Sequence, residues 1–245
     1  MFQEDESVLS RAAPGADEVV TYGPHPDQIA DVRFGTRLAT SRPLVLLIHG
    51  GFWRPAYDRG HTGPMAAAIA AAGWTVASIE YRRIPGNPDA TFEDIALATA
   101  NLRQRIQSHN GGLLLVGHSA GGHLALWAAS TLRDHELRGV IALAPAADLQ
   151  RVDELHLSND AVREFLGTDP SQRTDADPAL LRPAVPVTLV HGEEDMTVPI
   201  SVTESYAAKH PQARVIRIEH CGHFALIDPL SGAWPRVTQE MARFD

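Results

Sequence analysis

The sequence predicts an α/β protein, with a mainly parallel central sheet that is flanked by helices on both faces. Three observations lead to this class. Short apolar runs alternate along the chain with helix-like segments of about ten residues or more, which is the pattern of right-handed crossovers between parallel strands. The run LVLLIHG after Pro43 is apolar throughout, as expected of a strand that is buried on both faces. The chain has no internal repeat, which argues against a solenoid.

The individual elements follow from the spacing of the apolar residues. After a polar start, residues 18–22 and 30–34 are expected to pair as an edge hairpin around the Gly23-Pro24 turn signal. The LVLLIHG run then begins a regular series. Further strands are expected at 74–79, 113–116, 139–144, 187–191 and 214–218, and helices at 65–72, 91–108, 120–132, 201–210 and 233–244.

The alternation of strands and helices lapses between Ala146 and Pro186. The stretch AVREFLG predicts one short helix there, and the rest is polar and interrupted by prolines. Because the gap comes after the sixth strand-like run, we interpret residues 148–181 as a small cap or lid. One α/β domain commonly reaches 245 residues, so residues 1–245 are expected to form a single domain.

The composition is that of an ordinary globular protein, with 44% hydrophobic and 21% charged residues. The formal net charge is -9 and the basic residues are scattered, so nucleic acid is not an expected partner. The acidic residues 1–18 do not predict a secretory signal, and no apolar run approaches the roughly 20 residues of a membrane helix. With Cys221 as its single cysteine, the chain is expected to be cytoplasmic. The oligomeric state stays open, a homodimer included.

Residues 117–121 read GHSAG, which matches the pattern G-x-S-x-G between an apolar strand and an Ala/Leu-rich helix. Such a sharp turn pushes the hydroxyl of Ser119 out of the sheet, and the two glycines remove side chains that would collide there. The helix also directs its first N–H groups to this spot, which favours a negatively charged oxygen. The alternative is a glycine-rich turn with a capping serine, but the flanking strand and helix favour a nucleophile.

A serine hydroxyl is a weak nucleophile at neutral pH, so it needs a base and a third group that orients the base. The segment VTLVHGEEDMTVP, a strand followed by a loop, offers the carboxylates of Glu193, Glu194 and Asp195. The later segment VIRIEHCGHFALID offers the imidazoles of His220 and His223. These residues are the candidates for the acid and the base.

Three segments together carry a resemblance to a known family: the loop HGGFW at 49–53, the turn GHSAGGHLA and the stretch IEYRRIPGNPDATFEDI. They are similar to the HGG-containing branch of the α/β-hydrolases, which includes hormone-sensitive-lipase-like esterases and kynurenine formamidases. HGGFW in place of HGGG, and a turn close to GHSAGAHLA, favour the formamidase side. Arg83 stands where this branch carries a leucine. The resemblance covers the chain from about Pro43 onward and implies the α/β-hydrolase fold.

The resemblance also implies a catalytic triad in the chain order serine, acid, histidine. Ser119 is then the nucleophile, Asp195 in the G-x-x-D-x-x-V-P segment is the acid, and His223 is the base. His220 remains the second choice for the base. Asp148 remains a second choice for the acid, because some relatives take their acid from the loop after the preceding strand.

In the same family the HGG loop supplies main-chain donors to the oxyanion that forms during acyl transfer. The resemblance therefore implies that the N–H groups of Gly51, Phe52 and Ala120 form the oxyanion hole. Glycine suits this loop because a Cβ would obstruct the close approach of the substrate. The resemblance implies that His49 shapes the loop and does not act as the base.

Aromatic residues directly follow the oxyanion loop. Phe52, Trp53 and Tyr57 are expected to line the acyl or leaving-group pocket, unless they pack under the cap. Three apolar cap residues are further candidates for closing this pocket: Leu155, Leu157 and Phe165.

These residues predict a serine hydrolase for a small ester or amide, either an N-formyl aryl amide such as N-formylkynurenine or small carboxylic esters in general. A hypothesis of another class is a non-catalytic ligand receptor on the same fold. No cofactor is expected, because no G-x-G-x-x-G follows the first strand. No metal is expected either, because the stretch HCGH at 220–223 lacks a matching half-site.

Overall fold

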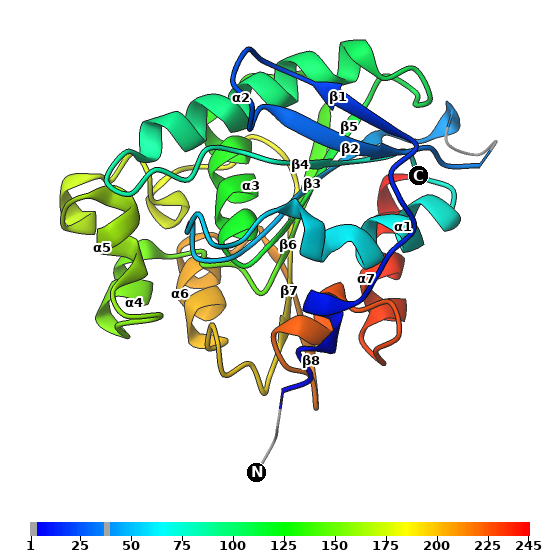
Figure 1. Ribbon diagram of the computed structural model, residues 1–245. Helices are drawn as coiled ribbons and strands as arrows, with labels where there is room; N and C mark the ends of the chain where they lie inside the picture. Colours follow the sequence, from blue (N-terminus) through cyan, green and yellow to red (C-terminus); the bar gives the residue numbers. More distant parts are fainter. Residues whose placement is uncertain (1–3, 37–39) are drawn as a thin grey trace.

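A computed structural model describes residues 4–36 and 40–245. Within these residues, one eight-stranded sheet has the order β1-β2-β4-β3-β5-β6-β7-β8 (Figure 1). The pairs β1·β2 and β2·β4 are antiparallel, and all other neighbours are parallel. The sheet confirms the mainly parallel α/β class and the expected edge hairpin. The strands are β1 (Glu18–Thr21), β2 (Ile29–Arg33), β3 (Leu44–Ile48), β4 (Val76–Ile79), β5 (Leu113–His118), β6 (Leu137–Leu143), β7 (Val187–Gly192) and β8 (Arg214–Ile218).

Helices cover both faces of this sheet, as the sequence predicts (Figure 1). One face carries α2 (Pro88–Arg105), α3 (Ala120–Thr131) and α6 (Ser201–Lys209), and the other carries α1 (Gly63–Ala71) and α7 (Trp234–Met241). In the described part of the chain, no helix is both long and apolar enough to cross a lipid bilayer.

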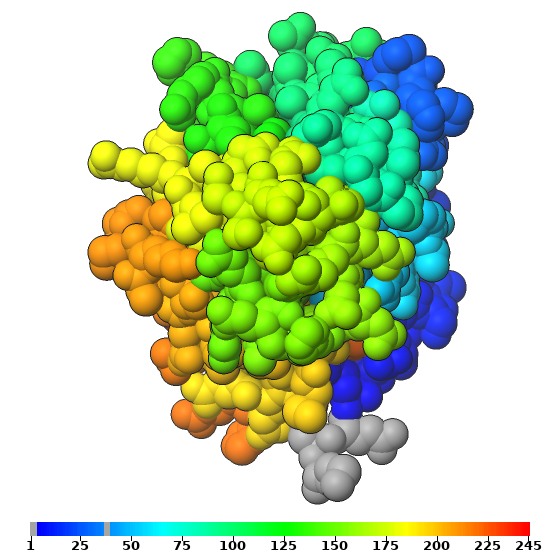
Figure 2. Space-filling model, turned by 90° about the vertical axis from the view of Figure 1, so that its left-hand side faces the viewer, coloured from blue at the N-terminus to red at the C-terminus, as the bar shows by residue number. Residues whose placement is uncertain are grey.

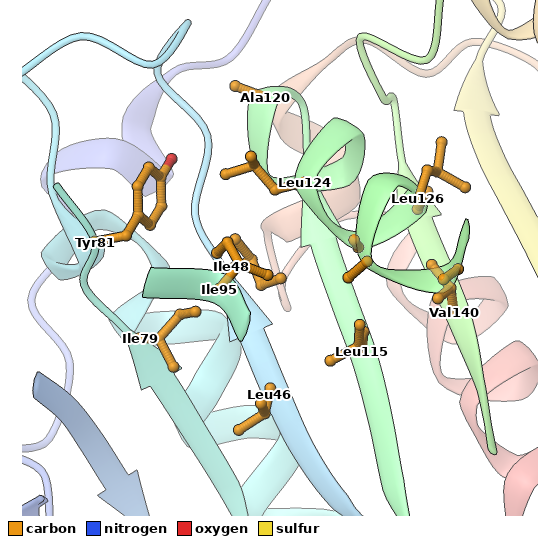
Figure 3. Packing of buried hydrophobic residues seen from close by; sticks show 14 of the residues in the cluster. Leu46, Ile48, Ile79, Tyr81, Ile95, Leu115, Ala120, Leu124, Leu126 and Val140 are labelled. Carbon is orange, nitrogen blue, oxygen red and sulfur yellow. The ribbon is translucent and has the colours of Figure 1, made fainter. Parts of the chain in front are cut away.

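The central strands are apolar throughout because both of their faces are buried. In β3, Leu46 and Ile48 face the core beneath α2 and α3, whereas Val45 and Leu47 face the core beneath α1 and α7. This alternation follows the two-residue period of a strand. Figure 3 shows the first of these cores, where Leu46 lies opposite Leu115 in the register of β3 and β5.

Residues 148–181, which the sequence predicts to form a cap and which are called the cap below, lie between β6 and β7. The short helix expected in AVREFLG is present as α5 (Ala161–Leu166), and a second helix, α4 (Leu149–Glu154), precedes it. α4 has no periodic apolar signal in the sequence, because this helix buries only Leu149 and Val152. The cap packs on α3 and α6 and covers the middle of one face of the molecule, in yellow-green in Figure 2.

The carboxyl ends of the parallel strands meet at one edge of the sheet, where α/β proteins bind their ligands. The loops that follow β3, β5, β7 and β8 all leave this edge. They carry residues 49–53, called the oxyanion loop after their expected role, together with the serine turn and the candidate acid and base. The fold therefore brings four distant segments of the sequence to one place.

Candidate active site

Ser119 lies at a strained turn between β5 and α3, with φ 55° and ψ -119°. Its N–H donates to the carbonyl of Leu143 on the neighbouring strand, at 2.8 Å. A Cβ on Gly117 would lie 2.1 Å from the carbonyl oxygen of Gly121, and one on Gly121 would lie 2.1 Å from that of Ile48. Only glycine fits at both positions, so the steric reason for the G-x-S-x-G spacing is confirmed.

His223 and Asp195 form a buried pair on the loops after β8 and β7. The Nδ1 of His223 lies 2.7 Å from Oδ2 of Asp195. The other oxygen, Oδ1, accepts the N–H groups of Thr197 at 2.9 Å and Val198 at 2.7 Å. Burial raises the pKa of the Asp195 carboxyl, but hydrogen bonds from His191 and His223 outweigh burial and hold this pKa below its ordinary value. An ionised Asp195 accepts the Nδ1–H of His223, which leaves Nε2 with a free lone pair.

Ser119 and His223 line the same cavity, whose volume is about 230 Å³. The structure therefore brings together the three residues that the sequence analysis selected. The cavity is lined by residues from the N-terminal segment, the oxyanion loop, the serine turn, the cap and the histidine loop: Glu6, Leu9, Gly51, Phe52, Tyr57, His61, His118, Ser119, Ser158, Thr197, His223 and Phe224.

His118, the residue before the serine, supports the histidine loop. Its Nε2 lies 3.1 Å from the carbonyl oxygen of His223, and the two rings are 4.4 Å apart. Burial, followed by the neighbouring His223, holds the pKa of His118 well below its ordinary value. A neutral His118 can donate one N–H to this carbonyl. The sequence analysis missed this contact because the pattern G-x-S-x-G leaves the position unspecified.

The alternative acid and base have other partners. His220 is exposed, and its Nδ1 lies 2.9 Å from Oε1 of Glu194. Asp148 caps α4 through the N–H of Arg151, and its other oxygen accepts from Ser205 at 2.6 Å and Lys209 at 2.7 Å. Neither His220 nor Asp148 lines the cavity.

The oxyanion loop has an unusual backbone. Gly51, Phe52 and Trp53 have φ of 109°, 49° and 56°, and the N–H of Arg54 donates to the carbonyl of Gly51 at 3.0 Å. Gly51 and Phe52 both line the cavity. Ala120 is the first residue of α3, where N–H groups have no partner within the helix. Two of the three expected donor residues therefore line the same cavity as Ser119, and the third directly follows Ser119 in the chain.

His49 and Glu80 hold the oxyanion loop from behind. The His49 ring is stacked on Tyr81, and its Nε2 lies 3.0 Å from Oε1 of Glu80. The second Glu80 oxygen accepts the N–H of Arg59 at 3.1 Å. Burial and then the charge of Arg83 lower the pKa of His49 to about 3. A fully buried imidazole with this low pKa lies behind the loop, and Glu80 was not among the residues selected from the sequence.

The expected position of Trp53 is wrong. Its side chain is only 3% exposed and does not line the cavity. It stacks on Phe165 of α5, and its Nε1 donates to Nδ1 of His123 at 3.3 Å. The positive φ of Trp53 turns its large ring under the cap, where it buries apolar area. Phe52 and Tyr57 do line the cavity.

The cap contributes a different residue to the pocket than expected. Leu155, Leu157 and Phe165 pack against the core beneath the cap and do not line the cavity. Ser158 is the cap residue that does. Apolar side chains on a thin cap are drawn to the core below it, so the exposed turn between α4 and α5 reaches the pocket instead.

The N-terminal segment forms another wall that the sequence analysis missed. Glu6 and Leu9, around the 3-10 helix η1 (Ser7–Ser10), line the cavity. Glu4 accepts the N–H of Phe224 at 2.8 Å, and Arg11 forms an ion pair with Asp228. These contacts join the segment to the loop that carries the histidine. Its polar, irregular sequence gives no periodic signal of such a role.

Within residues 4–36 and 40–245, no group of three or more His, Cys, Asp or Glu residues has the arrangement of a metal site.

The mainly parallel sheet, and the strained serine turn at its carboxyl edge, are those of an α/β-hydrolase. Within this class, the chain belongs to the BD-FAE family, whose model matches residues 30–209. This membership confirms the resemblance to α/β-hydrolases. Esterase B from Lactobacillus rhamnosis is a solved structure of similar fold, with a TM-score of 0.75 and 20% identity over 97% of this chain and 88% of that chain.

Curated relatives include both formamidases and esterases. Kynurenine formamidase from Salmo salar is 34% identical over 113 residues, which are 46% of this chain and 38% of the relative. Esterase LipC from Mycobacterium tuberculosis is 24% identical over 241 residues, which are 85% of this chain and 60% of the relative. The chain thus spans less than two thirds of the length of these relatives.

Proposed function

We propose that this chain is a serine hydrolase that cleaves small carboxylic esters through an acyl-enzyme intermediate. Ser119 is the nucleophile, His223 the general base and Asp195 the acid that orients the histidine. One observation carries the proposal: a buried Asp195–His223 hydrogen bond of 2.7 Å holds an imidazole that lines the same cavity as a serine on a strained turn. A structural serine needs no such partners, and strain of this kind is typical of functional sites.

In this mechanism the hydroxyl of Ser119 attacks the substrate carbonyl while Nε2 of His223 takes its proton. The leaving group then receives that proton, and water releases the acyl group by the same steps. Asp195 stabilises the imidazolium that forms in each half of the reaction. The charge on the substrate oxygen is met by the N–H groups of Gly51, Phe52 and Ala120, each of which contributes roughly 3 to 4 kcal/mol when it is aimed at the oxyanion.

The size of the cavity supports a small substrate. Its volume of about 230 Å³ is below the range of most ligand sites, which begins near 300 Å³. Its lining combines apolar residues such as Leu9, Phe52 and Phe224 with the polar groups at the serine turn. We therefore place short acyl groups first among its substrates. We also propose that residues 148–181 act as a cap on a single domain.

Labelling with a fluorophosphonate tests the proposal, because this reagent reacts with an activated serine. We expect the wild-type protein to be labelled once, at Ser119, and the reaction to be lost in Ser119→Ala. Peptide mass mapping identifies the labelled residue. A folded wild-type protein that stays unlabelled would favour the non-catalytic receptor.

A second candidate is hydrolysis of an N-formyl aryl amide. Formyl is the smallest acyl group, which suits the small cavity, and the relative from Salmo salar is a kynurenine formamidase. The two candidates predict different rates on N-formylkynurenine and on short p-nitrophenyl esters. A formamidase is expected to have a higher kcat/KM for N-formylkynurenine. A strong preference for the esters, measured side by side, would exclude this candidate.

A further inference from the structure

Arg54 links the oxyanion loop to the cap. Its Nη1 donates to Oγ of Ser158 at 2.6 Å, and its Nη2 donates to the carbonyl oxygen of Ser158 at 2.5 Å. Its Nε donates to Oε2 of Glu164 on α5, at 2.9 Å. One guanidinium thus makes a two-point contact with the turn between α4 and α5, and an ion pair with the helix that follows it.

Both segments that Arg54 joins have a strained backbone. On one side, Phe52 and Trp53 have positive φ values. On the other side, Ser158, Asn159 and Asp160 have φ of 49°, 54° and 58°. Non-glycine residues hold such conformations only where surrounding contacts impose them. Arg54 supplies such contacts on both sides, because its own N–H closes the turn onto the carbonyl of Gly51.

The two joined segments are also two walls of the same cavity. Phe52 contributes the oxyanion-loop wall, and Ser158 contributes the cap wall. The side chain of Arg54 is 26% exposed, so its contacts are partly shielded from water. Movement of the cap away from the cavity would have to break all three side-chain hydrogen bonds of Arg54.

Arg163 is an arginine of the cap whose ion pairs are structural. It pairs with Asp153 at 2.7 Å and with Asp169 at 2.9 Å, and both partners belong to the cap itself. Neither partner lines the cavity, and among the described residues the side-chain ion pairs of Arg163 stay within the cap. It offers a matched control for Arg54.

We propose that Arg54 is a positioning and specificity-determining residue. Its side chain holds Ser158 of the cap turn over the pocket. Because Arg54 also directly follows the oxyanion loop, the position of the oxyanion donor Phe52 then depends on whether the cap is closed. The cap turn then limits the acyl group to a short chain. This inference rests on the proposed hydrolase function. Release of the cap turn enlarges the pocket, so long acyl chains gain access while the contacts that hold short chains are lost.

The test compares Arg54→Gln, Arg54→Lys and Arg163→Gln on p-nitrophenyl acetate and octanoate. Loss of a charged hydrogen-bond set is expected to lower kcat/KM for acetate by about 10-fold in Arg54→Gln. A displaced oxyanion donor Phe52 lowers kcat, and the lost contacts to the short acyl chain raise KM. The octanoate-to-acetate ratio of kcat/KM is expected to rise by about the same factor. Arg54→Lys keeps the positive charge but lacks the planar guanidinium that bonds at two points. Its kcat/KM for acetate should therefore lie between those of Arg54→Gln and the wild-type protein. Arg163→Gln should retain the wild-type ratio.

A folded Arg54→Gln variant with the wild-type ratio and the wild-type KM would overturn the proposal. Glu164→Gln removes only the ion pair and should shift the ratio in the same direction, which keeps the test valid if Arg54→Gln does not fold. Hydrogen exchange gives a readout that is independent of turnover. We expect the backbone amides of residues 156–166 to exchange faster in Arg54→Gln. Unchanged exchange would contradict the proposed role of Arg54 in holding the cap turn. This readout does not depend on whether Ser119 reacts with fluorophosphonate.

Discussion

Ser119→Ala is expected to lower kcat by about 10⁶-fold on any ester that the wild-type protein cleaves. Without the hydroxyl, no acyl-enzyme can form, and the histidine and the carboxylate have no nucleophile to activate. What remains is the catalysis by the oxyanion donors and by binding, roughly 10³- to 10⁴-fold over water. The measurement is kcat from initial rates at saturating substrate, with protein of verified purity.

The same substitution should leave the fold intact, because alanine and serine differ by one oxygen and share the strain at φ 55°. A matched control is Ser130→Ala, which removes the hydroxyl of a buried serine in α3, the helix that follows Ser119; this hydroxyl donates to the carbonyl of Leu126 at 3.0 Å. We expect this control to retain kcat. If Ser119→Ala kept more than about one per cent of the wild-type kcat, another residue would have to be the nucleophile.

Asp195→Asn is expected to lower kcat by about 10⁴-fold. The side-chain amide has the size of the carboxylate, but it presents either an N–H or an uncharged oxygen to Nδ1 of His223. The imidazole is then held in the wrong tautomer, or its protonated form loses the charge that stabilises it. In the orientation where the amide oxygen still accepts the N–H groups of Thr197 and Val198, the loop should keep its shape and the amide NH₂ group faces Nδ1 of His223.

Asp148→Asn is the control for this second prediction. Asparagine can still cap α4, but it removes the ion pair with Lys209, so the substitution should lower the melting temperature while kcat stays near the wild-type value. The comparison discriminates between the two acids that the sequence left as alternatives. A loss of turnover in Asp148→Asn, with Asp195→Asn active, would reverse the assignment.

The central strands were predictable because a strand that is buried on both faces has apolar residues at successive positions. Leu44–Ile48 lies between Pro43 and the Gly50-Gly51 pair, the apolar run Leu113 to Val116 follows Gly111-Gly112, and both belong to central strands. The serine turn was predictable for a steric reason, since Gly117 and Gly121 stand where a Cβ would meet main-chain atoms. Local rules of this kind need no knowledge of distant residues.

Residues whose role depends on distant partners were not predictable. Trp53 and Tyr57 follow the same loop, but only Tyr57 lines the cavity, because the cap offers Trp53 the ring of Phe165. Glu80 and His118 carry no distinctive local signal, yet they hold the oxyanion loop and the histidine loop.

The sequence by itself determined the α/β class, the order of most strands and helices and the chemistry available at the serine turn, because these depend on apolar periodicity and on glycine at tight approaches. Only the tertiary structure decided which walls enclose the pocket. These walls come from parts of the chain that are far apart in the sequence. The N-terminal segment forms one wall, and the cap turn at Ser158, which Arg54 holds by hydrogen bonds, forms another. Such contacts arise from the packing of whole elements, and packing leaves no periodic trace in the segments that it brings together.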